Sequence, residues 1–200
     1  LDELVFNLLA HGSSKGRAET AFAALKEEYF DWNEVRVTIP ASIAETVNGV
    51  GLETMKATRL VKILQGIFED RSEVDLEFLS EMAVPAIRNY LGEMEGVGDN
   101  TIDTVLTFSL GMHFFPISKG ALRFSERFGL IASARRAADS QLMKEMFESE
   151  IEPGAMPEFV ALLDHHTEVV CKSDKPLCSS CTLNRKCAHA KSSKAKSKVT

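Results

Sequence analysis

Four cysteines near the C-terminal end constrain this chain more than any other feature, because all of them fall within one short segment. The spacing is Cys-x6-Cys-x2-Cys-x5-Cys, formed by Cys171, Cys178, Cys181 and Cys187. A disulfide framework would distribute its cysteines over distant parts of a small secreted domain, so this clustering indicates a metal site. Soft thiolate ligands select zinc or iron–sulfur clusters over hard cations. Zinc ribbons and fingers usually separate two cysteine pairs by longer connections, so the spacing favours iron–sulfur, with zinc and free thiols as the alternatives.

Apolar residues before this segment recur at helical spacing, whereas the alternation typical of strands is nearly absent. Stripes over residues 4–9, 60–68 and 102–110 repeat every three or four positions. This pattern predicts about ten short helices with short connections, and therefore a compact all-α protein. No apolar run approaches the roughly 20 residues that span a bilayer, and there is no signal-peptide pattern. We expect a cytoplasmic protein, nucleoid-associated if prokaryotic, with a further segment upstream because Leu1 already lies in an apolar helical stretch.

A glycine-rich corner, Met94-Glu95-Gly96-Val97-Gly98, lies between two of the predicted helices. Two glycines around a small apolar residue permit a tight turn that a Cβ atom would block. The next helix then begins with unpaired backbone N–H groups, which can bind a phosphate. Such a helix–hairpin–helix contacts the DNA backbone without reading the sequence. Taken alone, the Gly-Val-Gly run favours a plain corner between helices.

Together, the two segments resemble the endonuclease III-like superfamily of DNA glycosylases. The stretch V-C-K-S-D-K-P-L-C-S-S-C-T-L-N-R-K-C, residues 170–187, is similar to the [4Fe–4S] cluster loop of that superfamily, especially in its plant 5-methylcytosine DNA glycosylase branch. The run L-x-x-M-E-G-V-G-x-x-T-I-x-x-V-L-x-x-x-L-G, residues 91–111, resembles the hairpin and the helix after it. Residues 55–91 also match the plant branch in pattern, so the resemblance covers nearly the whole chain.

The resemblance implies an all-α, two-lobed fold of the helix–hairpin–helix glycosylase (HhH-GPD) type. Residues 1–112 would form a six-helix domain with the hairpin at residues 94–98. Residues 113–190 would form a helical iron–sulfur domain whose cluster loop spans residues 171–187, with all four cysteines as ligands. We interpret residues 191–200, which are rich in Lys, Ser and Ala, as a disordered basic tail.

The resemblance also implies which residues contact double-stranded DNA, with the protein acting as a monomer. The expected DNA-binding residues are Gly96, Val97, Gly98, Asn100, Thr101, His11, Lys172 and Lys175. Lys172 and Lys175 lie in the loop between the first two cysteines, and the alternative is that both are merely solvated. His11 stands where family members insert a glutamine into the gap left by a flipped base. The alternative for His11 is an ordinary surface histidine.

Both residues that carry the family's chemistry are replaced in this chain. Bifunctional members use a lysine two positions after the second hairpin glycine, and this position is Asn100, whose amide cannot form an imine. An aspartate is expected shortly downstream, and Ser118 stands there instead. Serine can cap the next helix as aspartate would, but it supplies no charge. Lys119 is the candidate for a relocated nucleophile, and the alternative is that it contacts phosphate or solvent.

The charge distribution is unusual for a protein that binds DNA. The net charge is −6, and the last ten residues carry four lysines and no acid, so the first 190 residues carry −10. DNA-binding proteins normally present a basic face, because neutralising phosphates supplies most of their affinity. The hairpin region itself is acidic, with Glu93, Glu95, Asp99 and Asp103. Each uncompensated carboxylate near a phosphate weakens binding, so the sequence predicts weak DNA affinity or a different partner.

Three hypotheses follow from these patterns. The first is an endonuclease III-like base-excision-repair protein that binds duplex DNA, including damaged or distorted DNA, without the standard glycosylase and AP-lyase chemistry. The second is an active DNA glycosylase/AP lyase whose nucleophile has moved, with Lys119 as the first candidate. The third is an iron–sulfur module for protein interaction or redox chemistry that no longer binds DNA. Whether the protein is an enzyme is left open by the sequence.

Overall fold

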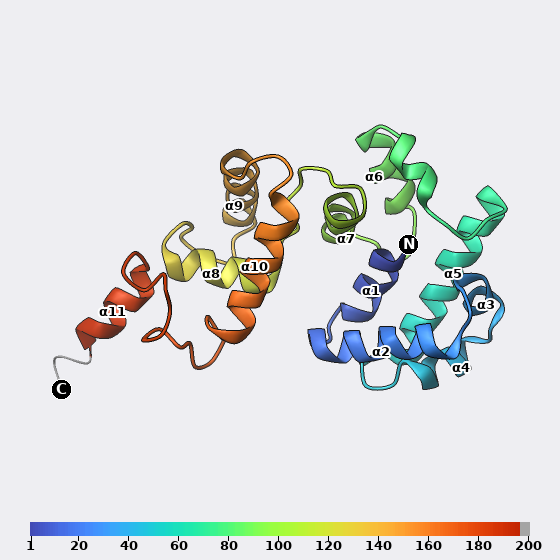
Figure 1. The fold of residues 1–200 in the computed structure, drawn as a ribbon, viewed down its shortest axis with the longest axis horizontal. Coiled ribbons are helices and arrows are strands. Elements are labelled where there is room, and N and C mark those ends of the chain that lie inside the picture. The colour runs from blue at the N-terminus through green and yellow to red at the C-terminus, as the bar shows by residue number, and fades with distance from the viewer. Residues whose placement is uncertain (197–200) are drawn as a thin grey trace. The chain divides into compact units, whose positions relative to one another are not determined.

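The computed structural model describes residues 1–196, and the side chains of residues 1–192, as an all-α protein (Figure 1). The described part of the chain contains eleven α-helices, one 3-10 helix and one π-helix. This confirms the all-α class expected from the apolar periodicity. The chain divides into two compact units, Leu1–Val105 and the residues from Leu106 onward.

The first unit contains seven α-helices and the 3-10 helix η1 among its described residues. These elements are α1 (Asp2–Ala10), α2 (Lys15–Glu28), α3 (Trp32–Val37), α4 (Pro40–Thr46), α5 (Glu53–Arg71), η1 (Glu77–Glu81), α6 (Val84–Gly92) and α7 (Asp99–Thr104). The count is one above the six of the implied domain, and the short helix α3, which buries only Val35, is the one that no apolar stripe predicts. The π-helix η2, Val105–Ser109, follows α7 and runs across the division between the units.

The long helix α5 organises the core of the first unit and contacts α1, α3 and α4. Leu60, Leu64 and Ile67 lie on one face of α5 and are fully buried. Burying a leucine or isoleucine side chain contributes roughly 1.5–3 kcal/mol of stability, so this stripe fixes the helix firmly. The start of α5 is tied down as well, because the Glu53 carboxylate accepts hydrogen bonds from the backbone N–H groups of Gly49 (3.0 Å) and Gly51 (2.9 Å).

The second unit has its own apolar core. Its helices are α8 (Lys119–Phe128), α9 (Ala137–Glu150), α10 (Met156–Val169) and α11 (Ala188–Lys196). The ring of Phe115 is fully buried and lies 4.7 Å from the ring of Phe147 between centroids. Helices α8 and α10 pack closely at Gly120, where a Cβ atom would come within 2.2 Å of the Thr167 hydroxyl. A side chain at residue 120 would therefore push α8 and α10 apart.

Two expectations about boundaries differ from the structure. The compact units divide between Val105 and Leu106, whereas the sequence-based division falls after residue 112. The tail was expected to be disordered from residue 191, but residues 191–196 continue helix α11. Alanine and lysine are strong helix formers, so this stretch extends a helix that begins at Ala188. Residues 197–200 of the expected tail lie outside the described residues. Among the helices that are described, none combines the length and apolarity needed to cross a bilayer.

Candidate functional site

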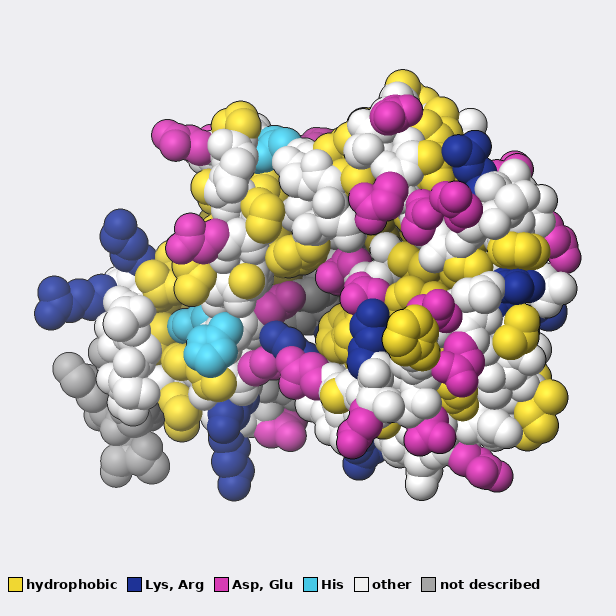
Figure 2. Space-filling model, turned by 45° about the vertical axis from the view of Figure 1, so that its right-hand side comes forward, with side chains coloured by type: hydrophobic (Ala, Val, Ile, Leu, Met, Phe, Trp, Pro, Cys, Tyr) yellow, Lys and Arg dark blue, Asp and Glu magenta, His cyan; other side chains and the backbone are white. Residues whose placement is uncertain are grey.

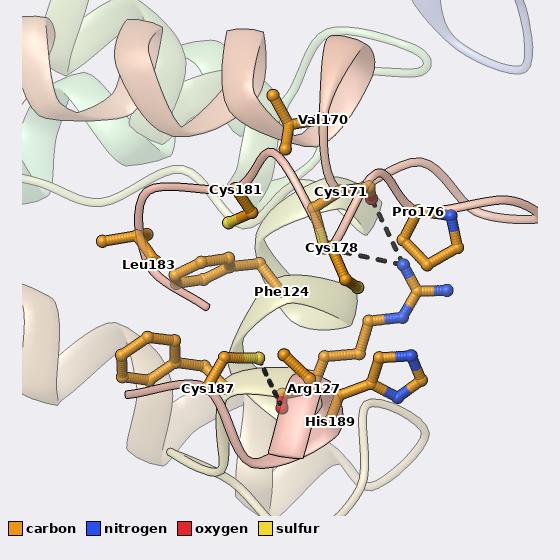
Figure 3. Close-up of a pocket in the computed structure, with 12 residues that line it drawn as sticks. Phe124, Arg127, Val170, Cys171, Pro176, Cys178, Cys181, Leu183, Cys187 and His189 are labelled. Carbon is orange, nitrogen blue, oxygen red and sulfur yellow. Dashed lines mark hydrogen bonds between the residues drawn. The ribbon is translucent and has the colours of Figure 1, made fainter. Parts of the chain in front are cut away.

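The four cysteines come together around one pocket of the second unit (Figure 3). They lie on the segment that follows α10, and each is half-buried. Phe124, Arg127 and Phe128 of α8 also line the pocket. The space between these side chains is about 370 Å³ when the part open to solvent is included. Thiols that are separated along the chain therefore line one shared pocket.

The chemistry of this donor set suits a thiophilic metal group. Burial raises the pKa of the Cys178 thiol, and negative charge on the other three cysteines raises it further, while Arg127 lowers it. Four thiolates gathered in one pocket repel one another unless cations neutralise them, and iron–sulfur clusters are held by four cysteine thiolates. The type and number of these ligands therefore suit an iron–sulfur cluster. As arranged in the described part of the chain, no group of three or more His, Cys, Asp or Glu side chains is placed to hold a metal ion.

Two arginines of α8 hold the cysteine segment in place. The Arg127 guanidinium donates to the backbone carbonyls of Lys172 (2.6 Å) and Ser173 (2.7 Å), and its Nη1 lies 3.5 Å from the Cys171 sulfur. Arg123 donates to the carbonyls of Thr167 (2.9 Å) and Cys171 (3.1 Å). Sequence reasoning missed both arginines. Their spacing of four residues, which places them on one helix face, was the signal that could have identified them.

The same network shapes the loop that carries two of the expected DNA-binding lysines. Lys172 and Lys175 both lie on the surface of the second unit. Arg127 binds the backbone of Lys172 and leaves its side chain exposed. The loop is thus fixed through its main chain while both lysine side chains face outward. This geometry suits contacts with a phosphate backbone, and equally a solvated surface.

The glycine corner forms a tight hairpin between α6 and α7 in the first unit. Gly96 has a φ of +88°, which favours glycine, and Val97 is buried. The Val97 N–H donates to the Met94 carbonyl (3.1 Å), and Gly98 is the N-cap residue of α7. Asn100 is exposed on the first turn of α7 beside the half-buried Thr101. The structure thus places five of the expected DNA-binding residues on one continuous corner.

The acidic character of this corner is compensated in part, because two of its four acidic side chains form ion pairs. Glu95 pairs with Arg59 (Nε–Oε1, 3.3 Å) and with Lys62 (Nζ–Oε2, 3.0 Å), both from α5. Asp103 is buried and pairs with Arg88 of α6. Sequence reasoning missed these three cations because they become neighbours of the acids only in the folded chain. Glu93 and Asp99 are exposed and form no ion pair among the described residues.

Ser118 lies at the start of α8 and caps that helix, as expected. Its Oγ accepts a hydrogen bond from the Ala121 N–H (3.0 Å). The same Oγ donates to Oδ1 of Asp164 on α10 (2.8 Å). A carboxylate therefore lies one hydrogen bond from the position at which the family's aspartate was expected, although it comes from another helix. Lys119 is the first residue of α8 and is exposed.

His11 follows α1 on the surface of the first unit. Its backbone N–H donates to the Asn7 carbonyl (3.0 Å), and Gly12 after it has a φ of +71°. The end of α1 is fixed from below by Lys56, whose buried ammonium donates to the carbonyls of Leu9 (2.7 Å) and Val50 (3.0 Å). The residue is thus presented on a short, anchored loop. His11, the hairpin and Asn100 belong to the first unit, and Ser118, Lys119 and the cysteines to the second.

The fold is that of the helix–hairpin–helix proteins of the endonuclease III type. Solved structures that share the fold include endonuclease III in a non-covalent complex with DNA, with a TM-score of 0.79 and 19% identity over 96% of this chain and 85% of that one. A thermostable thymine-DNA glycosylase matches with a TM-score of 0.77 and 17% identity over 96% and 84% of the two chains. No family model matches the sequence.

Sequence relatives point to the same superfamily. Endonuclease III of Sulfolobus acidocaldarius is 27% identical over 93% of this chain and 80% of its own length. A putative DNA glycosylase of Arabidopsis thaliana is 29% identical over 66% of this chain, which spans 45% of that relative. The DNA glycosylase/AP lyase ROS1 of Arabidopsis thaliana is 25% identical over 84% of this chain and only 13% of its own length. The protein is therefore related to the endonuclease III-like DNA glycosylases, and the resemblance to the plant branch is confirmed.

Proposed function

We propose that this protein binds duplex DNA as a monomer within base-excision repair, and that it recognises intact, damaged or distorted duplexes through the hairpin between α6 and α7. The observation that carries the proposal is the shared fold with endonuclease III in complex with DNA, which extends over 96% of this chain. The hairpin geometry supports it, because Gly96, Val97 and Gly98 form the tight corner that such contacts require.

The surface electrostatics favour moderate rather than tight binding. On the face shown in Figure 2, Asp and Glu side chains are spread widely, with Lys and Arg among them rather than gathered into one continuous patch. Phosphate neutralisation supplies most non-specific affinity. We therefore expect a DNA affinity that is modest at physiological salt and that rises steeply as the salt concentration falls.

Fluorescence anisotropy with labelled intact, abasic and mismatched duplexes over a salt series tests this proposal. A DNA-binding protein must show log affinity falling linearly with log salt concentration. Replacing both Lys172 and Lys175 by alanine should make the slope shallower by about 1 for each lost phosphate contact. A matched control is Lys186→Ala, which removes an exposed lysine further along the same segment. A flat salt response of the wild-type protein would contradict DNA binding and favour the protein-interaction or redox module.

We further propose that Cys171, Cys178, Cys181 and Cys187 hold a [4Fe–4S] cluster. The supporting observation is that all four thiols line one pocket. When bound, the cluster would supply a structural clamp that closes the segment from residue 171 to residue 187. Arg123 and Arg127 bind the backbone of this segment at the carbonyls of Cys171 and Lys172, which supports the proposal. Iron and acid-labile sulfide analysis of purified protein tests the assignment, and a colourless protein with one tightly bound zinc ion would contradict it.

We propose that the standard glycosylase and AP-lyase chemistry of the family is absent. Asn100 offers no amine for imine formation, and Ser118 offers no charge to stabilise a cationic sugar. Ser118 has a structural role, because it caps α8. Asn100 is exposed on the first turn of α7. Binding without cleavage is thus the simplest activity that these residues support.

A second candidate activity is favoured by one specific contact, the hydrogen bond between Ser118 and Asp164. It brings a carboxylate to the start of α8, where Lys119 is exposed as a potential nucleophile. Borohydride trapping on abasic DNA tests this candidate. A covalent adduct that is lost in Lys119→Ala, reduced in Asp164→Asn and kept in Lys186→Ala would establish a relocated active site. If the wild-type protein forms no adduct, the result contradicts a relocated nucleophile and favours DNA binding without catalysis.

A further inference from the structure

We infer that Arg59 and Lys62 of α5 are the cations that meet a DNA phosphate beside the hairpin, and that Glu95 occupies their donors until phosphate displaces it. This inference rests on the proposed DNA binding, and it concerns how the affinity for DNA is regulated. Neither cation lies in the hairpin segment itself, and neither was expected from the sequence. The regulating group is one carboxylate of the protein itself, which competes with a DNA phosphate for the two cations.

The first step is the contact between Arg59 and the hairpin backbone. A Cβ atom at residue 96 would lie 3.1 Å from Cδ and 3.3 Å from Nη1 of Arg59. Gly96 therefore has two roles, because it adopts a positive φ and also leaves room for an arginine side chain directly against the corner. The guanidinium of Arg59 is thus held at the glycine corner where a sugar–phosphate strand would pass.

The second step is the arrangement of the two cations. Arg59 and Lys62 are three residues apart on α5, so both project from the same helix face. They converge on the two oxygens of Glu95, at 3.3 Å from Arg59 Nε and 3.0 Å from Lys62 Nζ. A phosphodiester presents two anionic oxygens to a similar pair of donors. The carboxylate of Glu95 therefore occupies a binding geometry that suits a backbone phosphate.

The third step concerns how easily this carboxylate is displaced. The side chains of Glu95 and Lys62 are 52% and 62% exposed, whereas that of Arg59 is 27% exposed. Ion pairs with such exposure are weak, so a phosphate can compete for the donors. The buried pair of Asp103 and Arg88 is different, because breaking it would leave Asp103 uncompensated inside the protein. Glu95 is thus a displaceable competitor, and Asp103 is a fixed part of the fold.

The test compares Glu95→Gln with the wild-type protein in the duplex-binding assay over a salt series. Removing the competing charge should tighten binding by roughly twofold to fivefold at low salt, which is the range expected for an exposed ion pair. The matched control is Glu93→Gln, which makes the same charge change two residues earlier, at an exposed side chain without an ion pair. It should change the affinity less. All substituted side chains are exposed, so unchanged thermal unfolding of both variants is the expected check on folding.

A double variant isolates the role of the cation. Lys62→Ala should weaken binding and make the salt slope shallower by about 1. In the Lys62→Ala background, Glu95→Gln should tighten binding less than it does in the wild-type background, because one of the two donors is gone. The inference is wrong if Glu95→Gln tightens binding no more than Glu93→Gln does, or if its effect is unchanged without Lys62. If neither the wild-type protein nor Glu95→Gln binds any duplex, then the proposed DNA binding fails together with this inference.

Discussion

Lys56 is almost completely buried, with 2% of its surface exposed, and its ammonium donates to two backbone carbonyls. Replacing it with methionine should lower the free energy of unfolding by about 1–3 kcal/mol, because the carbonyls of Leu9 and Val50 lose their donor. Chemical denaturation measured at neutral pH checks this value. Lys62→Met serves as the control, since it removes an exposed lysine from the same helix. If Lys56→Met is more stable than the wild-type protein, the free-energy cost of burying the ammonium exceeds the stabilisation from its two hydrogen bonds.

The same residue predicts a dependence of stability on pH. Burial lowers the pKa of Lys56 below its ordinary value of 10.5, and Glu53 offsets only part of this effect. Between the lowered pKa and 10.5, the unfolded chain binds more protons than the folded one, so this lysine makes stability rise with pH. The rise should be absent from Lys56→Met in parallel denaturation series.

Individual residues also show what the sequence could and could not reveal. The four cysteines were recognisable because their chemistry and spacing are both local. Arg59 and Lys62 were not, because their partner Glu95 lies more than thirty residues away and the pairing depends on how α5 packs beneath the hairpin. The hydrogen bond from Ser118 to Asp164 was hidden for the same reason, since α8 and α10 meet only in the folded unit.

At the level of elements, α8 supports the cysteine segment mainly through Arg127. Its guanidinium reaches three carbonyls of that segment, those of Cys171, Lys172 and Ser173. Replacing Arg127 with methionine should speed local opening of residues 171–175 by about tenfold or more, because several hydrogen bonds to a charged group are lost. Amide hydrogen exchange of this segment measures the effect. Arg185→Met, which removes an exposed arginine later in the segment, should leave the exchange rates unchanged. Equal exchange in both variants would contradict the anchoring role.

The elements themselves were predicted unevenly. The long amphipathic helix α5 was evident from its apolar stripe over residues 60–68. Helix α3 was missed, because it has six residues and buries only Val35. Its capping pattern was the available signal: Asp31 accepts from the Glu34 N–H (2.8 Å), and the Glu34 carboxylate accepts from the Phe30 N–H (2.7 Å). The stability of such a short helix comes mainly from hydrogen bonds that cap its ends, and an apolar stripe contributes little.

At the level of the whole molecule, two separate cores predict that losing the proposed cluster would affect the units differently. The cysteine pocket is lined by α8 and by the segment after α10, and so belongs wholly to the second unit. Removing iron with a chelator, with a thiol reductant present so that the released cysteines do not form disulfides, should leave four thiols without the positive charge that holds them together. Hydrogen exchange should then accelerate in residues 170–190 and in α8. The buried face of α5 should keep its protection, because Leu60, Leu64 and Ile67 pack within the first unit.

The matched control for this experiment is Cys178→Ser, which removes one thiolate without any chelator. If the cluster stabilises only the second unit, Cys178→Ser and the iron-depleted wild-type protein should show the same pattern of exchange, and DNA binding through the hairpin should persist at reduced affinity. Loss of protection in α1 and α5 to the same degree as in α8 would show that the two units unfold as one. The cluster would then stabilise the hairpin surface as well, and iron content would control DNA affinity directly rather than through the loop of Lys172 and Lys175.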